Sequence, residues 1–400
     1  MLPKILLLSD IFPPKTGGSG RWFWEIYSRL PRDRVVVATG MDERSTEFDQ
    51  THNLQVRRLP LTMATRGLRP FGNLKHYLKT AWRIRRLVKH EGITAIHAGR
   101  NLPEGFLAYL VRRLTGVPYI CYVHGEDVGV SATSRELAWM TRRVFAKASA
   151  VIANSQNTRA MLLNEWKLPE AKVHLLYPGV DTKRFVPASR DETVRQSLGW
   201  QDRKVLLTVG RLQKRKGHDM LIRALPAIRE RHPDVLYAIL GEGEERSRLQ
   251  ELANSSPHTP CAGVGTRSVP TTMGVQFLGE IDDAQLLTCY QQCDLFVLPN
   301  RAIGRDVEGF GMVLLEAQAC GKPVVAGESG GTAETMSIPN TGRIVPCESP
   351  ELLAQLLIEL LDDPTRLDTM GQAGRAWVQE HFDWDSLAVQ AGEVFAKVGK

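Results

Sequence analysis

The sequence has no hydrophobic run long enough to cross a membrane, no internal repeat and no low-complexity tract. Its longest apolar runs have the length of β-strands, whereas a transmembrane helix needs about 20 consecutive apolar residues. Residues 1–4 lead directly into one such run and lack the longer apolar core of a secretory signal. These absences predict a globular cytoplasmic protein.

Cysteine is also scarce, with six residues scattered over 400 positions. Cys289 and Cys293 lie one helical turn apart, but no His or second Cys pair completes a zinc pattern with them. No Asp-x-Asp motif, which could hold a divalent cation, follows a predicted strand. We therefore expect reduced thiols, no metal ion and no bound cofactor.

Strand-sized apolar runs alternate with helical patterns along the chain, as in parallel sheets with crossover helices. We predict a first Rossmann-like domain over residues 1–184, a second over 185–382 and a C-terminal helix within 383–400. The polar stretch 181–201 reads as a linker, and the Pro-, Gly- and Ser-rich stretch 255–274 reads as a surface loop without an assigned role. The expected strands are 5–8, 35–38, 55–59, 95–97, 119–123, 150–153 and 173–176, then 205–209, 236–240, 275–278, 295–298, 323–326 and 343–345.

Two carboxylates frame a glycine-rich turn and an apolar helical pattern in residues 308–316. Gly309 and Gly311 lack a Cβ atom, so the backbone there can turn sharply and approach a ligand closely. The free amides of the following helix form the positive end of a dipole, which suits a phosphate. Glu308 and Glu316 can each accept two hydroxyl hydrogen bonds, as a sugar diol offers. Taken alone, the segment leaves open a plain helix start with an acidic cap and one solvated Glu.

A basic loop follows the predicted strand 205–209. Arg211 and Lys216 are the candidate diphosphate ligands, because α/β folds bind ligands at the carboxyl ends of their strands. Arg211 can bind a phosphate bidentately, and Lys216 adds a mobile point charge. A charge run is most often a solvated loop, and Lys214 and Arg215 are expected to be no more than that.

The first predicted strand is followed by Gly17 and Gly18, whose amides can face a donor phosphate. A dinucleotide-binding turn, and with it an NAD-dependent oxidoreductase, is the alternative. Phe23 stands where that fingerprint needs a small residue, although Asp42 near the end of the second strand leaves the alternative open. A non-catalytic two-lobed sugar-binding protein is a third alternative, but it would not need the basic loop.

His124 follows the predicted strand 119–123 and precedes Gly125. An isolated His is more often a packed or surface residue than a catalytic one. Its place at the carboxyl end of a strand favours a role in the site. Glu126 and Asp127 either orient His124, bind acceptor hydroxyls or cap the next helix.

This spaced set of motifs resembles the family 4 retaining glycosyltransferases, and the resemblance covers nearly the whole chain. Within that family, the segments 306–309, 316–321 and 329–331 are most similar to the phosphatidylinositol-mannoside mannosyltransferases. The matching pieces are Gly17-Gly18, His124-Gly125-Glu126, Asn154-Ser155, Pro178-Gly179-Val180-Asp181 with Phe185, Gly210-Arg211, Lys216-Gly217, Leu278-Gly279 and residues 308–316.

The resemblance implies the α/β architecture called GT-B: two Rossmann-like domains, a cleft between them and a C-terminal helix that crosses back onto the first domain. It implies that the groups nearest the reaction are those of Glu308, His124, Arg211 and Lys216. The expected donor-binding residues are Gly17, Gly18, Arg211, Lys216, Leu278, Gly279, Glu308, Gly309, Phe310, Gly311, Met312 and Glu316. The expected acceptor-binding residues are Asp10, Arg100, His124, Glu126 and Asp127.

These features predict a retaining, metal-independent hexosyltransferase that uses a nucleotide-diphosphate sugar. Arg211, Lys216 and helix amides would take the place of a metal ion at the leaving group. Front-face substitution is favoured over double displacement, because the resemblance places Glu308 against donor-sugar hydroxyls. We favour GDP-mannose as donor and a lipid-linked or glycan acceptor. The alternative is a UDP-sugar-dependent hexosyltransferase of polysaccharide or lipopolysaccharide synthesis.

The two halves differ in charge. Residues 1–184 contain 29 Lys and Arg against 15 Asp and Glu, a balance of +14, and residues 185–400 contain 22 against 29, a balance of −7. An excess of this size predicts an anionic surface facing the first half.

The helical pattern 73–86 is the densest basic region, and such helices can lie on acidic lipid headgroups. With nearby apolar loop residues, it predicts peripheral binding to the inner face of the cell membrane; the alternative is a helix packed on the core by its Leu and Trp. No nucleic-acid-binding signature accompanies it. The basic stripe is Lys75, Lys79, Arg83 and Arg86, the apolar face is Leu74, Leu78, Ala81 and Trp82, and the loop residues are Leu61, Met63, Leu68 and Phe71.

Overall fold

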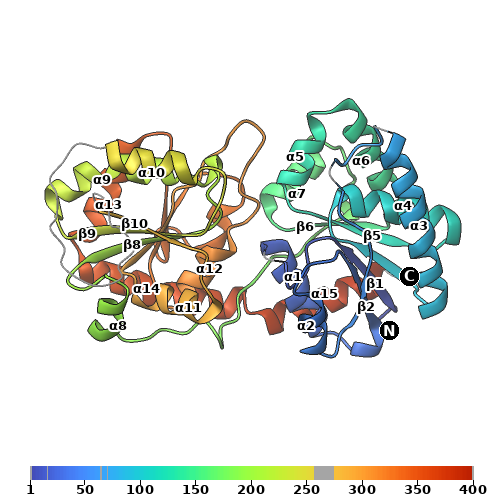
Figure 1. Cartoon of the computed structure of the whole chain (residues 1–400), viewed down its shortest axis with the longest axis horizontal. Helices are drawn as coiled ribbons and strands as arrows, with labels where there is room; N and C mark the ends of the chain where they lie inside the picture. Colours follow the sequence, from blue (N-terminus) through green and yellow to red (C-terminus); the bar gives the residue numbers. More distant parts are fainter. Residues whose placement is uncertain (1, 16, 64, 70, 256–273, 399–400) are drawn as a thin grey trace. The chain divides into compact units, whose positions relative to one another are not determined.

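The computed structural model describes the chain except residues 1, 16, 64, 70, 256–273 and 399–400 (Figure 1). The chain divides into two compact units. The first unit comprises Met1–Gly179 and Trp384–Lys400, and the second comprises Val180–Asp383. The predicted loop 255–274 lies almost wholly outside the described residues.

The first unit is built on a seven-stranded parallel sheet with the order β3-β2-β1-β4-β5-β6-β7. The central strand β1 pairs with β2 on one side and with β4 on the other. The strand order therefore reverses between β1 and β4, which is where open α/β sheets bind ligands. The strands are β1 (Ile5–Ser9), β2 (Val35–Thr39), β3 (Gln55–Arg58), β4 (Ala95–Ala98), β5 (Tyr119–Val123), β6 (Ala150–Ala153) and β7 (Val173–Leu175).

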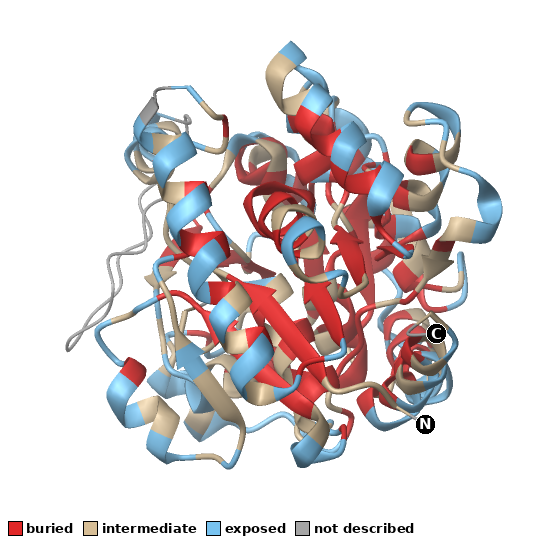
Figure 2. Cartoon of the chain, turned by 90° about the vertical axis from the view of Figure 1, so that its right-hand side faces the viewer, coloured by how far each residue is buried: buried red, intermediate tan, exposed pale blue. Residues whose placement is uncertain are grey.

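Helices cover both faces of this sheet (Figure 1). The main core lies between the sheet and α3, α4 and α6, and Figure 2 shows the strands as the most deeply buried part of the unit. The helices are α1 (Gly18–Ser28), α2 (Ser45–Gln50), α3 (Phe71–Glu91), α4 (Phe106–Thr115), α5 (Glu126–Ala132), α6 (Arg135–Lys147), α7 (Gln156–Asn164) and α15 (Trp384–Val398).

The C-terminal helix α15 packs on α1 of the first unit, which confirms the predicted crossing. The Phe395 ring stacks on Tyr27 with a centroid distance of 5.8 Å. At the other end of α15, Asp385 accepts a hydrogen bond from Arg29 Nε at 2.7 Å. An aromatic stack and an ion pair thus attach the last helix to the first.

The second unit has a six-stranded sheet with the order β10-β9-β8-β11-β12-β13, again with parallel pairs throughout. Its order reverses between β8 and β11. The strands are β8 (Lys204–Val209), β9 (Val235–Leu240), β10 (Val275–Gly279), β11 (Leu295–Leu298), β12 (Val324–Gly327) and β13 (Gly342–Val345). The helices are α8 (Glu192–Ser197), α9 (His218–Arg231), α10 (Arg246–Ser255), α11 (Asp283–Gln292), α12 (Met312–Ala319), α13 (Pro350–Leu361) and α14 (Pro364–His381).

The interpretation of residues 181–201 as a linker was wrong, because this stretch folds as part of the second unit. Arg195 of α8 is buried, and its guanidinium donates to the carbonyls of Gln292 and Arg203. Trp200 is fully buried and donates through Nε1 to Gln276 at 2.7 Å. A polar segment can be buried here because its charged group is paired.

Within the described part of the chain, we find no helix that combines the length and apolarity needed to span a bilayer.

Candidate active site

The two loops at the switch point of the second sheet lie in direct backbone contact. Gly217 ends the loop after β8 with a left-handed φ of 70°, and a Cβ atom there would lie 1.7 Å from the Pro299 carbonyl oxygen. A Cβ atom on Gly330, after β12, would lie 1.8 Å from the Glu308 carbonyl oxygen. Only glycine permits these approaches. The loops after β8, β11 and β12 therefore form one packed surface at the carboxyl edge of the sheet.

Glu308 lies on this surface and is paired with two cations. Lys216 Nζ and Arg215 Nη1 both donate to Glu308 Oε2, at 2.6 and 2.7 Å. Burial alone would raise the pKa of Glu308, but Lys216 and then Arg215 outweigh it and lower the pKa below its usual value. Glu308 is therefore ionised at neutral pH, and the structure brings its carboxylate together with the Lys216 ammonium.

Arg215 was misjudged as a solvated loop residue. Its side chain is largely buried, and besides Glu308 it contacts Asp306 Oδ1 through Nε at 3.2 Å. Lys214 is exposed, as expected. No local pattern separates Lys214 from Arg215, because the carboxylates that pair with Arg215 lie about 90 residues away along the chain.

Arg211 lies on the same loop with an exposed side chain that has no protein partner among the residues the structure describes. Its carbonyl oxygen accepts a weak hydrogen bond from His218 Nε2 at 3.4 Å. The loop backbone is therefore anchored while the guanidinium stays available to a ligand.

Helix α12 begins at the same edge, after Gly311 in a left-handed conformation with φ of 98°. Phe310 buries its ring against Phe382, at a centroid distance of 5.8 Å, so its backbone amide is what it can offer a ligand. Glu316 is half-buried and accepts a hydrogen bond from Tyr290 Oη at 2.7 Å. That bond fixes one carboxylate oxygen of Glu316.

Leu278 and Gly279 close β10 at the same carboxyl edge. Gly279 has a left-handed φ of 71°, and its carbonyl accepts the Gly241 amide at 2.9 Å. Both residues are half-buried, and their strand lies two strands from β8.

In the first unit, Asp10 follows β1 at the switch point between β1 and β4. Its Oδ1 accepts hydrogen bonds from Thr62 Oγ1 at 2.6 Å and Lys15 Nζ at 3.2 Å. Its backbone amide donates to Glu104 Oε1 at 2.9 Å. Glu104 is 0% exposed and follows β4, so its carboxyl group joins the two loops.

Glu104 was missed by the sequence analysis, since nothing in its local pattern marks it as buried. Arg100 lies near it, with Nε 3.7 Å from Glu104 Oε1. Burial raises the pKa of Glu104, and Arg100 only partly offsets this. The second oxygen, Oε2, is buried without a hydrogen-bond partner among the described residues.

His124 follows β5 and is held on three sides. Its ring Nε2 donates to the Gly99 carbonyl at 2.7 Å, and its backbone amide donates to Asp127 Oδ1 at 3.0 Å. Its carbonyl accepts from Asn154 Nδ2 at 3.3 Å. Burial lowers the pKa of His124, with Asp127 partly opposing the shift, so the neutral ring carries its proton on Nε2.

Asp127 lies in the first turn of α5, and the same Oδ1 atom also accepts the Val128 amide at 3.0 Å, so one oxygen holds the His124 backbone against that turn. Glu126 beside it is exposed. Gly17 and Gly18 stand at the start of α1, which follows β1 at the same edge. The predicted residues thus form two groups, one along the carboxyl edge of each sheet. No group of three or more His, Cys, Asp or Glu in the described ranges could hold a metal ion.

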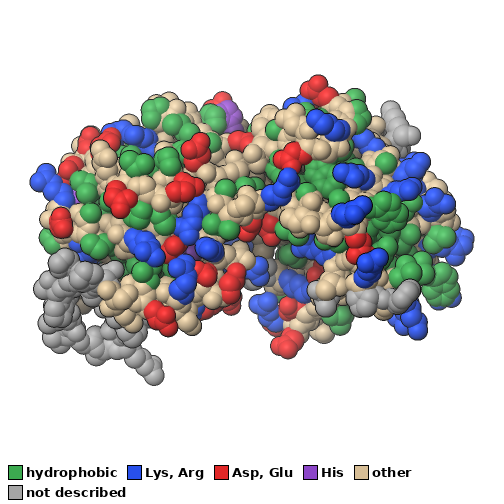
Figure 3. All heavy atoms as spheres, turned by 90° about the horizontal axis from the view of Figure 1, so that it is seen from above, with side chains coloured by type: hydrophobic (Ala, Val, Ile, Leu, Met, Phe, Trp, Pro, Cys, Tyr) green, Lys and Arg blue, Asp and Glu red, His purple; other side chains and the backbone are tan. Residues whose placement is uncertain are grey.

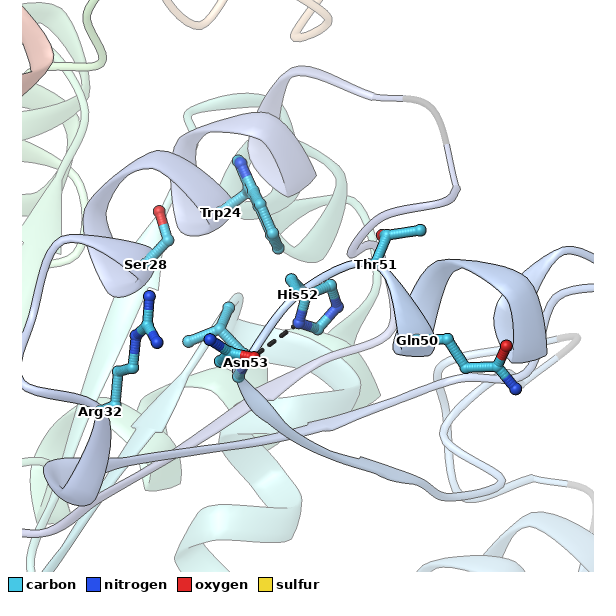
Figure 4. A pocket seen from close by; sticks show the side chains of 8 residues that line it. Trp24, Ser28, Arg32, Gln50, Thr51, His52 and Asn53 are labelled. Atoms are coloured by element: carbon cyan, nitrogen blue, oxygen red, sulfur yellow. Dashed lines mark hydrogen bonds between the residues drawn. The ribbon is translucent and has the colours of Figure 1, made fainter.

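A surface pocket of about 340 Å³ lies elsewhere in the first unit (Figure 4). The pocket lies where α1 and α2 end and is lined by Trp24, Ser28, Arg32 and residues 50–54, which include His52. Because α1 begins at the carboxyl edge of the sheet, its C-terminal end lies at the opposite edge. The pocket contains none of the predicted site residues.

Two family descriptions match the chain. Glycosyltransferase Family 4 matches residues 16–184, and Glycosyl transferases group 1 matches residues 203–363. Together they cover both units.

Two relatives and one solved structure show what the chain is similar to. A GDP-mannose-dependent monoacylated alpha-(1-6)-phosphatidylinositol monomannoside mannosyltransferase from Corynebacterium glutamicum is 32% identical over 393 residues, covering 96% of this chain and 95% of that protein. A GDP-mannose-dependent alpha-(1-6)-phosphatidylinositol monomannoside mannosyltransferase from Mycolicibacterium smegmatis is 32% identical over 402 residues, covering 98% of each. The Anabaena protein HepE, solved in complex with UDP, has a TM-score of 0.80 at 22% identity, covering 98% of this chain and all of that one. These likenesses confirm the predicted GT-B fold.

Proposed function

The chain belongs to the family 4 glycosyltransferases, and on that premise we propose that it transfers mannose from GDP-mannose to a phosphatidylinositol-linked mannoside. Transfer would retain the anomeric configuration and need no metal ion. One observation carries the proposal within the structure: Lys216 and Arg215 converge on Glu308 at the switch point of the second sheet, next to Arg211. The similarity to two GDP-mannose-dependent enzymes, 32% identity over nearly the full length, supports the choice of donor.

The leaving diphosphate would be neutralised by Arg211, Lys216 and the first amides of α12. A guanidinium, an ammonium and a helix N-terminus together supply the positive charge that a departing diphosphate requires. Glu316 would bind the ribose diol through the carboxylate that Tyr290 holds in place. Leu278 and Gly279 would frame the base with their backbone.

Glu308 would bind hydroxyls of the donor sugar rather than attack its anomeric carbon. Its Oε2 is committed to two cations, and that pairing reduces its nucleophilicity. In the front-face route, the bond from the anomeric carbon to the phosphate oxygen breaks as the acceptor oxygen bonds on the same face. The acceptor proton moves to the departing phosphate, so no protein base is required.

The acceptor would meet the first unit. Neutral His124 has Nδ1 as a free acceptor, and Asp10 and Arg100 add one carboxylate and one guanidinium at the same edge of the sheet. Asp127 sets the His124 backbone, and exposed Glu126 can reach an acceptor hydroxyl. This mixture of charges suits a polyol phosphate that carries both hydroxyls and negative charge.

We further propose that α3 binds the cytoplasmic face of an anionic membrane. Leu78 is 55% and Trp82 46% exposed, and the Arg86 guanidinium lies 3.6 Å from the centre of the Trp82 ring. The predicted alternative, in which Leu and Trp pack on the core, is wrong, because Tyr77, Ala81 and Ile84 form the buried face instead. Figure 3 shows hydrophobic side chains lying among Lys and Arg on the first unit. Such a surface binds acidic headgroups.

The loop before α3 contributes less to this surface than expected. Leu61 is fully buried, and Met63 and Leu68 pack against the core, so none of them is an outward anchor. The side chain of Phe71 lies outside the described residues.

The test is transfer of radiolabelled sugar by the purified protein to phosphatidylinositol monomannoside in mixed micelles. GDP-mannose should be used, UDP-glucose and UDP-galactose should not, and excess EDTA should leave turnover unchanged. A product whose new linkage is cleaved by an α-mannosidase would support retention. Transfer from a UDP-sugar in place of GDP-mannose would overturn the donor assignment, and loss of turnover in EDTA would overturn metal independence.

A further inference from the structure

Two cations share a single oxygen of Glu308. Lys216 and Arg215 both bind Oε2, while Oε1 accepts no hydrogen bond from any side chain or amide in the described part of the chain. The carboxylate is therefore split into one neutralised oxygen and one oxygen available to a ligand. One cation is enough to neutralise an accessible carboxylate, so the second cation is expected to have a role of its own.

Arg215 is held more firmly than Lys216. Its Nε contacts Asp306 at 3.2 Å, and its carbonyl accepts the Arg301 amide at 2.8 Å. Arg301 in turn donates to Asp219 of α9 at 3.0 Å. Arg215 is thus fixed between the loops after β8 and β11 by both backbone and side chain. Among the described residues, the Lys216 ammonium contacts only the carboxylate of Glu308.

Lys216 faces two anions when the donor binds. Its ammonium must move toward the diphosphate to neutralise the leaving group, yet Glu308 is only 9% exposed. If Lys216 were the only cation paired with Glu308, its departure would leave a buried, unpaired carboxylate. That carboxylate would either keep the lysine from moving to the diphosphate or take up a proton. In both cases the donor site would be weakened.

We propose that Arg215 is a positioning residue that stays paired with Glu308 when the donor binds, which frees Lys216 for the diphosphate and leaves Glu308 Oε1 open to a donor-sugar hydroxyl. This inference rests on the proposed donor site and extends it to a residue that neither touches the diphosphate nor reacts. Asp306 has the supporting role of holding the guanidinium at the correct angle.

The central experiment compares Arg215→Met with Lys214→Met. Both variants remove one positive charge from the same loop. The Lys214 side chain, however, is exposed and forms no hydrogen bond or ion pair with the described residues. Arg215→Met should weaken GDP-mannose binding, measured by calorimetry, by about 10- to 100-fold, because it unpairs a largely buried carboxylate. Lys214→Met should stay within about 2-fold of wild type, as exposed charges contribute little. Equal effects in the two variants would overturn the proposal.

The acid limb of the kcat/KM profile supplies a readout that general destabilisation would not move. Burial raises the pKa of Glu308, while Lys216 and Arg215, the charged groups facing it, lower that pKa. Without Arg215 the pKa of Glu308 must rise, so the acid limb of Arg215→Met should shift to higher pH. Arg215→Lys should restore part of the shift. An unmoved acid limb in Arg215→Met contradicts the proposal.

A double-mutant cycle separates action through Glu308 from any other effect. If Arg215 acts on Glu308, the losses in Arg215→Met and Glu308→Gln should be far from additive in the double variant. Additive losses would overturn the proposal. Wild-type protein that binds GDP-mannose but glycosylates no phosphatidylinositol mannoside would refute the proposed acceptor alone, since the calorimetric comparison of Arg215→Met with Lys214→Met reads donor binding and needs no acceptor. If wild type binds a different nucleotide sugar, the donor assignment fails and the same comparison is made with that sugar.

Discussion

The switch points of the two sheets share a topology but hold their charged groups in opposite ways. In the first unit, Asp10 and His124 are oriented through backbone amides that donate to Glu104 and Asp127. In the second unit, Glu308 is held by side-chain ion pairs alone among its carboxylate contacts. Backbone-held carboxyls are fixed in position, whereas side-chain ion pairs can exchange partners when a charged ligand arrives. The first arrangement suits recognition of hydroxyls, and the second suits a diphosphate that enters and leaves in each cycle.

The charge of each half does not predict the charge of its site. The first half carries a balance of +14, yet its site mixes Asp10, Glu104 and Asp127 with Lys15 and Arg100. The second half carries −7, and its site mixes Arg211, Arg215 and Lys216 with Asp306 and Glu308. The positive excess of the first half instead includes the exposed stripe on α3. The net charge of a half therefore describes its outer surface. The charges at the site depend on which loops the sheet topology brings together.

Removing both candidate diphosphate ligands should produce the largest effect. Arg211→Ala combined with Lys216→Ala should lower kcat/KM by at least about 10³-fold, or about 4 kcal/mol, because the leaving-group charge is no longer neutralised. Steady-state kinetics with GDP-mannose measure it. The matched pair in the first unit, Lys15→Ala with Arg100→Ala, should leave donor binding unchanged. Near wild-type turnover in the first double variant would refute the phosphate clamp.

Glu316→Ala should weaken GDP binding by about 100-fold, since two hydrogen bonds to a charged acceptor are lost. Tyr290→Phe is the control, because it removes the hydrogen bond from Tyr290 Oη to Glu316 and leaves the carboxylate in place. Calorimetry with GDP should find the control close to wild type. If the two variants bind GDP equally poorly, Glu316 has a structural role and does not contact the nucleotide.

Glu104→Leu should raise the acceptor KM about 10-fold while the donor KM stays constant, because a buried Asp10 amide left without an acceptor costs about 1–3 kcal/mol. Glu104→Gln keeps an oxygen for that amide and should behave much like wild type. The measurement is acceptor titration at saturating donor. A rise in donor KM of the same size would mean that the two switch points are not chemically separate.

The smallest effect concerns the membrane surface. Leu78→Ser with Trp82→Ser should weaken sedimentation with vesicles containing phosphatidylinositol by about 5-fold, since both side chains are only half exposed to begin with. Leu352→Ser, an exposed leucine of the second unit, is the matched control and should bind like wild type. If all variants bound the vesicles equally, the attraction would come from the basic residues and the acidic headgroups alone. High salt should then release the protein from the vesicles fully.

The sequence by itself determined the strands, the two Rossmann-like units and the glycine at the start of α12. These follow from local periodicity and from the rule that loops at the carboxyl ends of parallel strands meet. His124 was placed by the same rule.

Tertiary structure alone decided the partners of single side chains. Arg215 and Glu308 are 93 residues apart, and the amide of Asp10 and Glu104 are 94 apart. Tertiary structure also decided that Arg195 is buried although its sequence neighbours are polar, and which face of α3 points outward. Burial and pairing depend on which distant segments share a surface, and a local pattern of residue types carries no information about that.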